Sequence, residues 1–132
     1  MSAVATMIAL SLFVGLVALL IAFQVTLALG TPWGRLAWGG QHAGKLPLGC
    51  RIASAASILV YGFIAALALD AGGAINLFPS GFSHIAMWVV FGYLTLGTLM
   101  NALSRSKPER FVMTPVALSL AFLALIIATH PK

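Results

Sequence analysis

Four long apolar stretches dominate the sequence, and they predict four membrane-spanning helices. The stretches run over about 4–29, 52–71, 84–104 and 111–129. Each approaches or exceeds the roughly 20 residues that a helix needs to cross a hydrocarbon core of ~30 Å. None alternates polar and apolar residues with the period of a membrane β-barrel strand. We therefore predict an all-α integral membrane protein, a four-helix bundle that forms a single transmembrane domain over residues 1–132.

The composition agrees with lipid as the solvent of this chain. Hydrophobic residues make up 61% of the sequence and charged residues only 7%, whereas a soluble domain carries about 25% charged residues. The N-terminal stretch has no basic residue and is longer than the roughly 7–15-residue apolar core of a secretory signal. We expect it to be retained as the first span.

The basic residues lie on one side of the predicted bundle. Six of the seven are in loop 1 (30–51) and loop 3 (105–110), and the last is Lys132. The positive-inside rule then places loops 1 and 3 in the cytoplasm and both termini outside, in the cell inner (plasma) membrane. This bias also accounts for the net charge of +5, so we expect no nucleic-acid partner.

Loop 1 combines glycines and prolines with Trp33 and Trp38. Tryptophan favours the headgroup level of a bilayer, so the loop is predicted to lie at the cytoplasmic interface. One interpretation is that its backbone N–H groups, Arg35 and Lys45 hold an anionic headgroup or phosphate. The alternative is a connector that the two Trp residues simply anchor.

Polar side chains within the spans concentrate near the predicted cytoplasmic end. Gln24 is in the first span, and helical stripes follow in the second (Arg51, Ser54, Ser57, Tyr61) and the third (Thr95, Thr98, Asn101, Arg105). This predicts a vestibule with Arg51 and Arg105 at its mouth. The alternative is ordinary packing with interhelical hydrogen bonds of about 0.6 kcal/mol, including one between Gln24 and Asn101. The outer half is expected to have no such layer.

The remaining ionisable residues have structural interpretations. Ser106 to Glu109 matches a capping box at the start of the fourth span, and Asp70 is expected to be a solvated interfacial carboxylate. His84 and His130 lie at similar depth to Asp70 but without metal-ligand spacing. No metal or cofactor is predicted.

Gly-Thr-Pro-Trp-Gly at 30–34, followed by Gly39-Gly40, Leu46-Pro47 and Arg51, resembles a family of small uncharacterised bacterial four-span membrane proteins. Asn101, the segment 106–110 and Pro115 match further features of that family. The resemblance covers most of the chain. It implies a bacterial inner-membrane protein and implies no activity.

Together these patterns favour a non-enzymatic membrane protein that binds an anionic lipid headgroup or a small anion at its cytoplasmic face. Its partners would be membrane lipid, an anionic small molecule, and further copies of itself or another membrane protein. A homo-oligomeric transporter or channel and an accessory subunit stay open as alternatives. A lipid-modifying enzyme has only His42, Cys50 and Glu109 to use on that face. The candidate ligand-binding residues are Arg35, Lys45, Arg51, Gln24, Ser54, Ser57, Thr98, Asn101, Arg105 and Arg110, with Trp33 and Trp38 as interfacial anchors.

Overall fold

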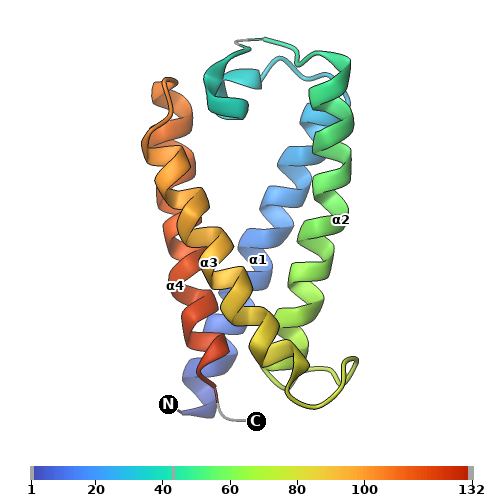
Figure 1. Cartoon of the computed structure of the whole chain (residues 1–132), viewed down its shortest axis with the longest axis vertical. Coiled ribbons are helices and arrows are strands. Elements are labelled where there is room, and N and C mark those ends of the chain that lie inside the picture. The colour runs from blue at the N-terminus through green and yellow to red at the C-terminus, as the bar shows by residue number, and fades with distance from the viewer. Residues whose placement is uncertain (1, 43, 131–132) are drawn as a thin grey trace.

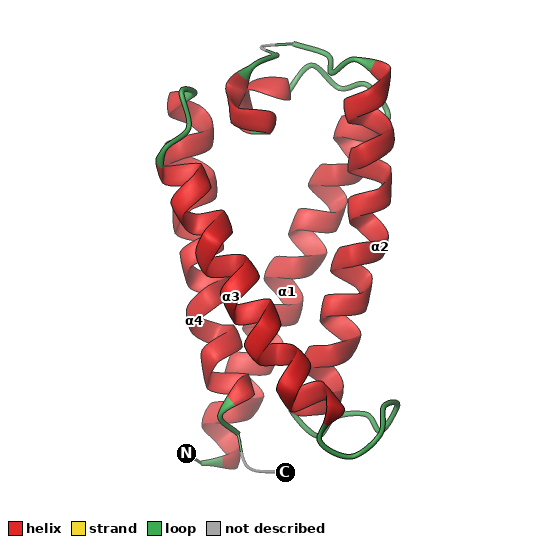
Figure 2. Ribbon diagram, in the orientation of Figure 1, coloured by secondary structure: helices red, strands yellow, loops and turns green. Residues whose placement is uncertain are grey.

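The computed structural model describes residues 2–42 and 44–130, which form four long helices and no strand (Figure 2). All four are long and apolar enough to cross a membrane, which confirms the all-α prediction of four candidate spans. The helices are α1 (Ala3–Ala28), α2 (Leu48–Ala71), α3 (Phe82–Ala102) and α4 (Thr114–Ala128). A π-helical turn, η3 (Glu109–Met113), leads into α4, and two 3-10 turns, η1 (Gly34–Leu36) and η2 (Trp38–Gly40), lie in loop 1.

Glycines determine where α1 and α2 end. Gly30 has φ 92°, its N–H donates to the carbonyl of Leu27, and the N–H of Thr31 donates to that of Thr26. This is a Schellman motif, which needs a left-handed residue that glycine supplies without strain. The same arrangement recurs at Gly73, with φ 84°.

Two helix boundaries differ from the predicted ones in a way that moves candidate residues. In the structure loop 1 covers 29–47, because α2 already begins at Leu48. Arg51 therefore lies on α2 rather than in the loop. α3 ends at Ala102, so Arg105 lies beyond the helix and does not extend its polar stripe. From here on, loop 1 denotes 29–47, loop 2 denotes 72–81 and loop 3 denotes 103–108.

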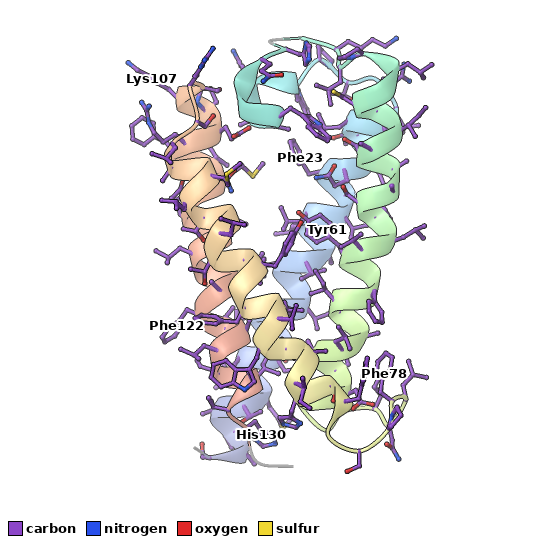
Figure 3. The ribbon with its side chains drawn as sticks, viewed as in Figure 1. Phe23, Tyr61, Phe78, Lys107, Phe122 and His130 are labelled. Carbon is purple, nitrogen blue, oxygen red and sulfur yellow. The ribbon has the colours of Figure 1, made fainter. Side chains whose placement is uncertain are left out.

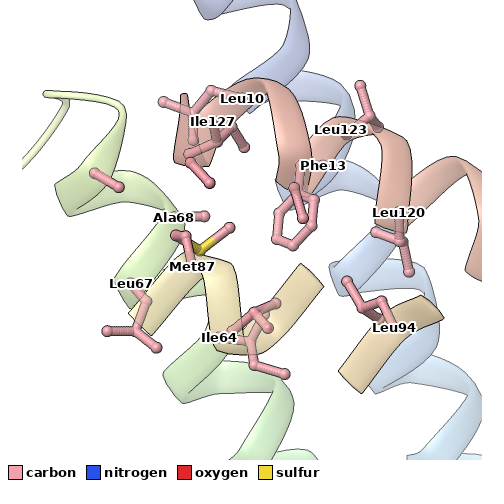
Figure 4. Close-up of a cluster of buried hydrophobic side chains, with 14 of the residues drawn as sticks. Leu10, Phe13, Ile64, Leu67, Ala68, Met87, Leu94, Leu120, Leu123 and Ile127 are labelled. Carbon is pink, nitrogen blue, oxygen red and sulfur yellow. The ribbon is translucent and has the colours of Figure 1, made fainter. Parts of the chain in front are cut away.

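The helices pack as two pairs, α1 with α2 and α3 with α4 (Figure 1). The pairs meet near the two termini and diverge toward loop 1, which closes over that end. The buried core lies where they meet and draws on all four helices, with Phe13, Ala68, Met87 and Ile127 fully buried (Figure 4). Large apolar side chains such as Leu59 cover the outside, as lipid contact requires.

Candidate ligand-binding cavity

A cavity of about 320 Å³ lies beneath loop 1, where the two helix pairs diverge. All four helices, η3 and loop 1 contribute to its wall, which is mainly apolar and aromatic. Phe23 and Tyr61 point into this space from α1 and α2 (Figure 3). Ligand pockets in proteins range from about 300 to 1,000 Å³. The cavity is therefore large enough for a small molecule or for one end of a longer one.

Three of the predicted ligand-binding residues, Gln24, Ser57 and Asn101, line this cavity. Ser57 donates its hydroxyl proton to the carbonyl of Ala53 on its own helix. The side-chain amides of Gln24 and Asn101 have no hydrogen-bond partner within the described residues, so the bond between them that the packing alternative included is absent. Both amides are available to a molecule in the cavity.

Glu109 supplies a carboxylate to the same wall. It is the first residue of η3, and only 4% of it is exposed. Its Oε2 accepts a hydrogen bond of 3.2 Å from the N–H of Gly39 in loop 1. Among residues 2–42 and 44–130, no other side chain or backbone group donates to this carboxylate, and neither Arg105 nor Arg110 pairs with it.

The predicted capping box is wrong. The Ser106 hydroxyl donates to the carbonyl of Arg35 in loop 1, and Glu109 also bonds to that loop rather than back to Ser106. Both side chains bond to loop 1 instead of to each other's backbone because loop 1 lies against loop 3. The residues that the sequence assigned to starting a helix instead join two loops.

Loop 1 fits closely enough against loop 3 to act as a cover for the cavity. Gly40 has φ 73°, and a Cβ atom there would lie only 2.4 Å from the Cβ of Ser106. The neighbouring residues Trp38 and Gly39 line the cavity. Trp38 itself has φ 55°, a left-handed conformation that bulky residues rarely adopt. The cover is therefore held by contacts with loop 3.

The predicted basic residues lie outside the cavity. Arg51 donates its Nε–H to the carbonyl of Ala28 at 3.0 Å, which joins the end of α1 to α2. Arg110 donates to the carbonyl of Ser104 and lies over the ring of Phe111. The other basic candidates, Arg35, Lys45 and Arg105, are exposed. Within the part of the chain that the structure describes, Glu109 is the one charged side chain that lines the cavity.

Two other candidates, Ser54 and Thr98, lie away from the cavity. Ser54 is fully buried, and its hydroxyl has no partner among the described residues. Thr98 donates to the carbonyl of Leu94 on its own helix. Neither lines the cavity, and the interfacial candidate Trp33 is exposed on loop 1.

At the opposite end of the bundle, Asp70 is completely buried, so the expectation of a solvated carboxylate is wrong. Its Oδ2 accepts from the N–H groups of Leu77 and Phe78 at 2.7 and 2.8 Å. Its Oδ1 accepts from the hydroxyl of Ser83 at 2.6 Å. The carboxylate therefore holds loop 2 against the start of α3.

His130 forms a second polar cluster at this end. Its Nδ1 lies 3.1 Å from the hydroxyl oxygen of Thr6, and its carbonyl oxygen lies 2.6 Å from Nε2 of His84. The expectation that this half has no polar layer is therefore also wrong. No cluster of three potential metal ligands occurs in the described part of the chain.

Trp38, Tyr93 and Glu109 are cavity residues that the sequence did not indicate. Trp38 was assigned to the interface and Glu109 to helix capping. The available signal was weak: Tyr61 and Tyr93 are the two tyrosines of the chain, and both lie within predicted spans. Only the fold shows that both line one cavity.

No family model matches this sequence, and comparisons with curated proteins and with solved structures found no match. The resemblance to small bacterial four-span proteins therefore stays a prediction. Function has to be argued from the residues of the cavity.

Proposed function

We propose that this chain is a non-enzymatic, multi-pass membrane protein that binds an amphipathic molecule in the cavity under loop 1. The molecule would present a neutral or cationic polar group to Glu109, Gln24 and Asn101, and its apolar part to the aromatic wall. The main support for this proposal is the buried carboxylate of Glu109. A buried carboxylate is costly unless charge or hydrogen bonds compensate it, and a single backbone N–H leaves most of its accepting capacity unused.

The charge of the cavity favours this ligand over an anion. Glu109 repels an anion at short range, and no arginine or lysine among residues 2–42 and 44–130 lines the wall to offset that repulsion. The two free amides offer donors and acceptors to a neutral group. An ammonium or hydroxyl group therefore suits the cavity better than a phosphate does.

The orientation is part of the proposal. Six of the seven basic residues belong to loops 1 and 3 or the helix turns beside them, and such a bias is typical of cytoplasmic loops. The cavity would then be reached from the cytoplasmic leaflet, with both termini on the other side.

A tryptophan reporter in the wall tests the proposal. In the Trp33→Phe, Trp88→Phe protein, Trp38 is the one remaining tryptophan. Its fluorescence is titrated in phosphatidylcholine nanodiscs with dodecylammonium, dodecanol and dodecanoate, which share one tail. We expect saturable binding in that order of affinity. Glu109→Gln should weaken dodecylammonium binding about tenfold, since a charge-assisted hydrogen bond contributes roughly 1.5–3 kcal/mol.

The control is Thr98→Val, because Thr98 bonds within its own helix and does not line the cavity. It should leave all three titrations unchanged. The proposal fails if no probe gives a saturable response, or if dodecanoate binds most tightly with or without Glu109.

A second candidate function is the predicted binding of an anionic lipid, now on the surface rather than in the cavity. The contact between Ser106 and the Arg35 carbonyl brings exposed Arg35 close to Arg105 and Lys107 of loop 3. Basic residues at an anionic membrane surface contribute about 1 kcal/mol each. Native mass spectrometry should show phosphatidylglycerol retained over phosphatidylcholine, with this preference lost when all three residues are changed to Gln. Equal retention of the two lipids would contradict it.

The transporter, channel and accessory-subunit alternatives stay predictions, because no specific contact in the structure favours one of them.

A further inference from the structure

We infer that the ligand is a long-chain amphiphile whose hydrocarbon tail leaves the cavity beside Tyr93 and lies in an apolar groove between α2 and α3. The inference rests on the proposed function for the polar group. It adds the chemical class of the ligand and the path by which the tail leaves the protein.

The groove has a volume of about 510 Å³ and runs along the side of the bundle. One wall is formed by α2 between Val60 and Leu67, and the other by α3 between Phe82 and Tyr93. Among the residues that the structure describes, no charged side chain lines it, and Tyr93 provides its one side-chain polar group. Such a lining suits a saturated or unsaturated hydrocarbon chain and offers nothing to a second headgroup.

The groove and the cavity adjoin at Tyr93. Tyr93 lines both of them and is 53% exposed. On the facing helix, Tyr61 lines the cavity while the adjacent Val60 lines the groove. A chain that starts among the polar groups under loop 1 therefore passes between these two helices at the tyrosines. This shared edge distinguishes the groove from the rest of the lipid-facing surface.

Its length fits an acyl-type chain. Along α3, Asn101 lies about 12 Å from Tyr93, and Tyr93 lies about 16 Å from Phe82, at 1.5 Å per residue. The groove is therefore about half as long as the ~30 Å hydrocarbon core. A short amine fits wholly within the cavity, whereas a dodecyl chain held at Asn101 extends past Tyr93 into the groove.

Two tryptophan positions at matched depth test this path. Phe63 lines the groove and is 50% exposed, while Trp88 lies on α3 outside the groove and is 48% exposed. Each is about 10 Å from the loop-2 end of its helix. The groove reporter is Phe63→Trp with the three native tryptophans changed to Phe. The bulk-lipid reporter is the protein that keeps only Trp88.

Both proteins are titrated in phosphatidylcholine nanodiscs with dodecylammonium that carries bromine atoms at its chain end, which quench nearby tryptophan. We expect saturable quenching at Phe63→Trp and only linear, non-saturable quenching at Trp88. Adding Glu109→Gln should shift the saturable part to about tenfold higher dodecylammonium concentration. Chain-end-brominated butylammonium should change the fluorescence of Trp38 in the Trp33→Phe, Trp88→Phe protein. It should give no saturable quenching in the Phe63→Trp protein, because its chain is too short.

The outcomes separate this inference from the proposed function. The tail lies in bulk lipid if both reporters show equal linear quenching while the Trp33→Phe, Trp88→Phe protein still shows a saturable response at Trp38. The groove is then ordinary lipid-facing surface, and this inference is overturned while the proposed function survives. No response at Trp38 overturns both.

Discussion

Replacing Asp70 with alanine should destabilise the bundle strongly, although the residue lies far from the cavity. The change removes a fully buried carboxylate that accepts three hydrogen bonds, two from loop 2 and one from Ser83. Loop 2 would lose its attachment to α3, and the hydroxyl of Ser83 would be left buried without this acceptor.

The magnitude follows from the three bonds. A hydrogen bond to a charged group contributes about 1.5–3 kcal/mol net. Leu77 lies on the exposed part of loop 2 and Phe78 is only half-buried, so their N–H groups regain bonds to water. The Ser83 hydroxyl is completely buried and does not. We therefore expect Asp70→Ala to lower the free energy of unfolding by about 3 kcal/mol, and Ser83→Ala, which removes one bond, by about 1–2 kcal/mol.

The assay is unfolding in mixed micelles with increasing dodecyl sulfate, followed by far-ultraviolet circular dichroism. Ser80→Ala is the control, because Ser80 is exposed on the same loop and such surface changes usually stay within about 0.5 kcal/mol. A loss below about 0.5 kcal/mol for Asp70→Ala would refute the reasoning. Equal losses for Asp70→Ala and Ser83→Ala would show that the two loop amides gain nothing from the carboxylate.

Three further predictions concern the cover, the core and the orientation. Gly40→Ala should release loop 1 from loop 3 and speed its tryptic cleavage, whereas Gly39→Ala, which has a similar positive φ but open space around it, should show only the left-handed backbone cost of about 1–2 kcal/mol. Phe13→Ala should cost about 3–5 kcal/mol in the dodecyl sulfate assay because it empties the centre of a close-packed core, while exposed Leu12→Ala should cost little. Cys50, the single cysteine of the chain, should react with a membrane-impermeant maleimide in inside-out vesicles but not in intact cells. Labelling in intact cells would reverse the proposed orientation.

The sequence by itself determined the number of spans and their approximate ends. A chain with so few charged residues can only be solvated by lipid, and each apolar stretch has the length that a bilayer requires. The first predicted span stopped directly before Gly30, close to the observed end of α1 at Ala28, because the left-handed residue of a helix end has a strong local preference for glycine. The sequence also predicted how deep a residue lies in the bundle. Gln24 and Asn101 were placed near one end because a helix rises by a constant amount per residue.

Only the tertiary structure decided which side chains meet. Glu109 had a plausible partner three residues away, but in the folded chain it bonds to Gly39 in loop 1 and faces the cavity. Arg51 had the right depth for the cavity mouth, but it turns toward the end of α1. Depth along a helix follows from local geometry. Direction around the helix and contacts between loops depend on how the two helix pairs diverge, and that results from many weak contacts spread over the whole bundle.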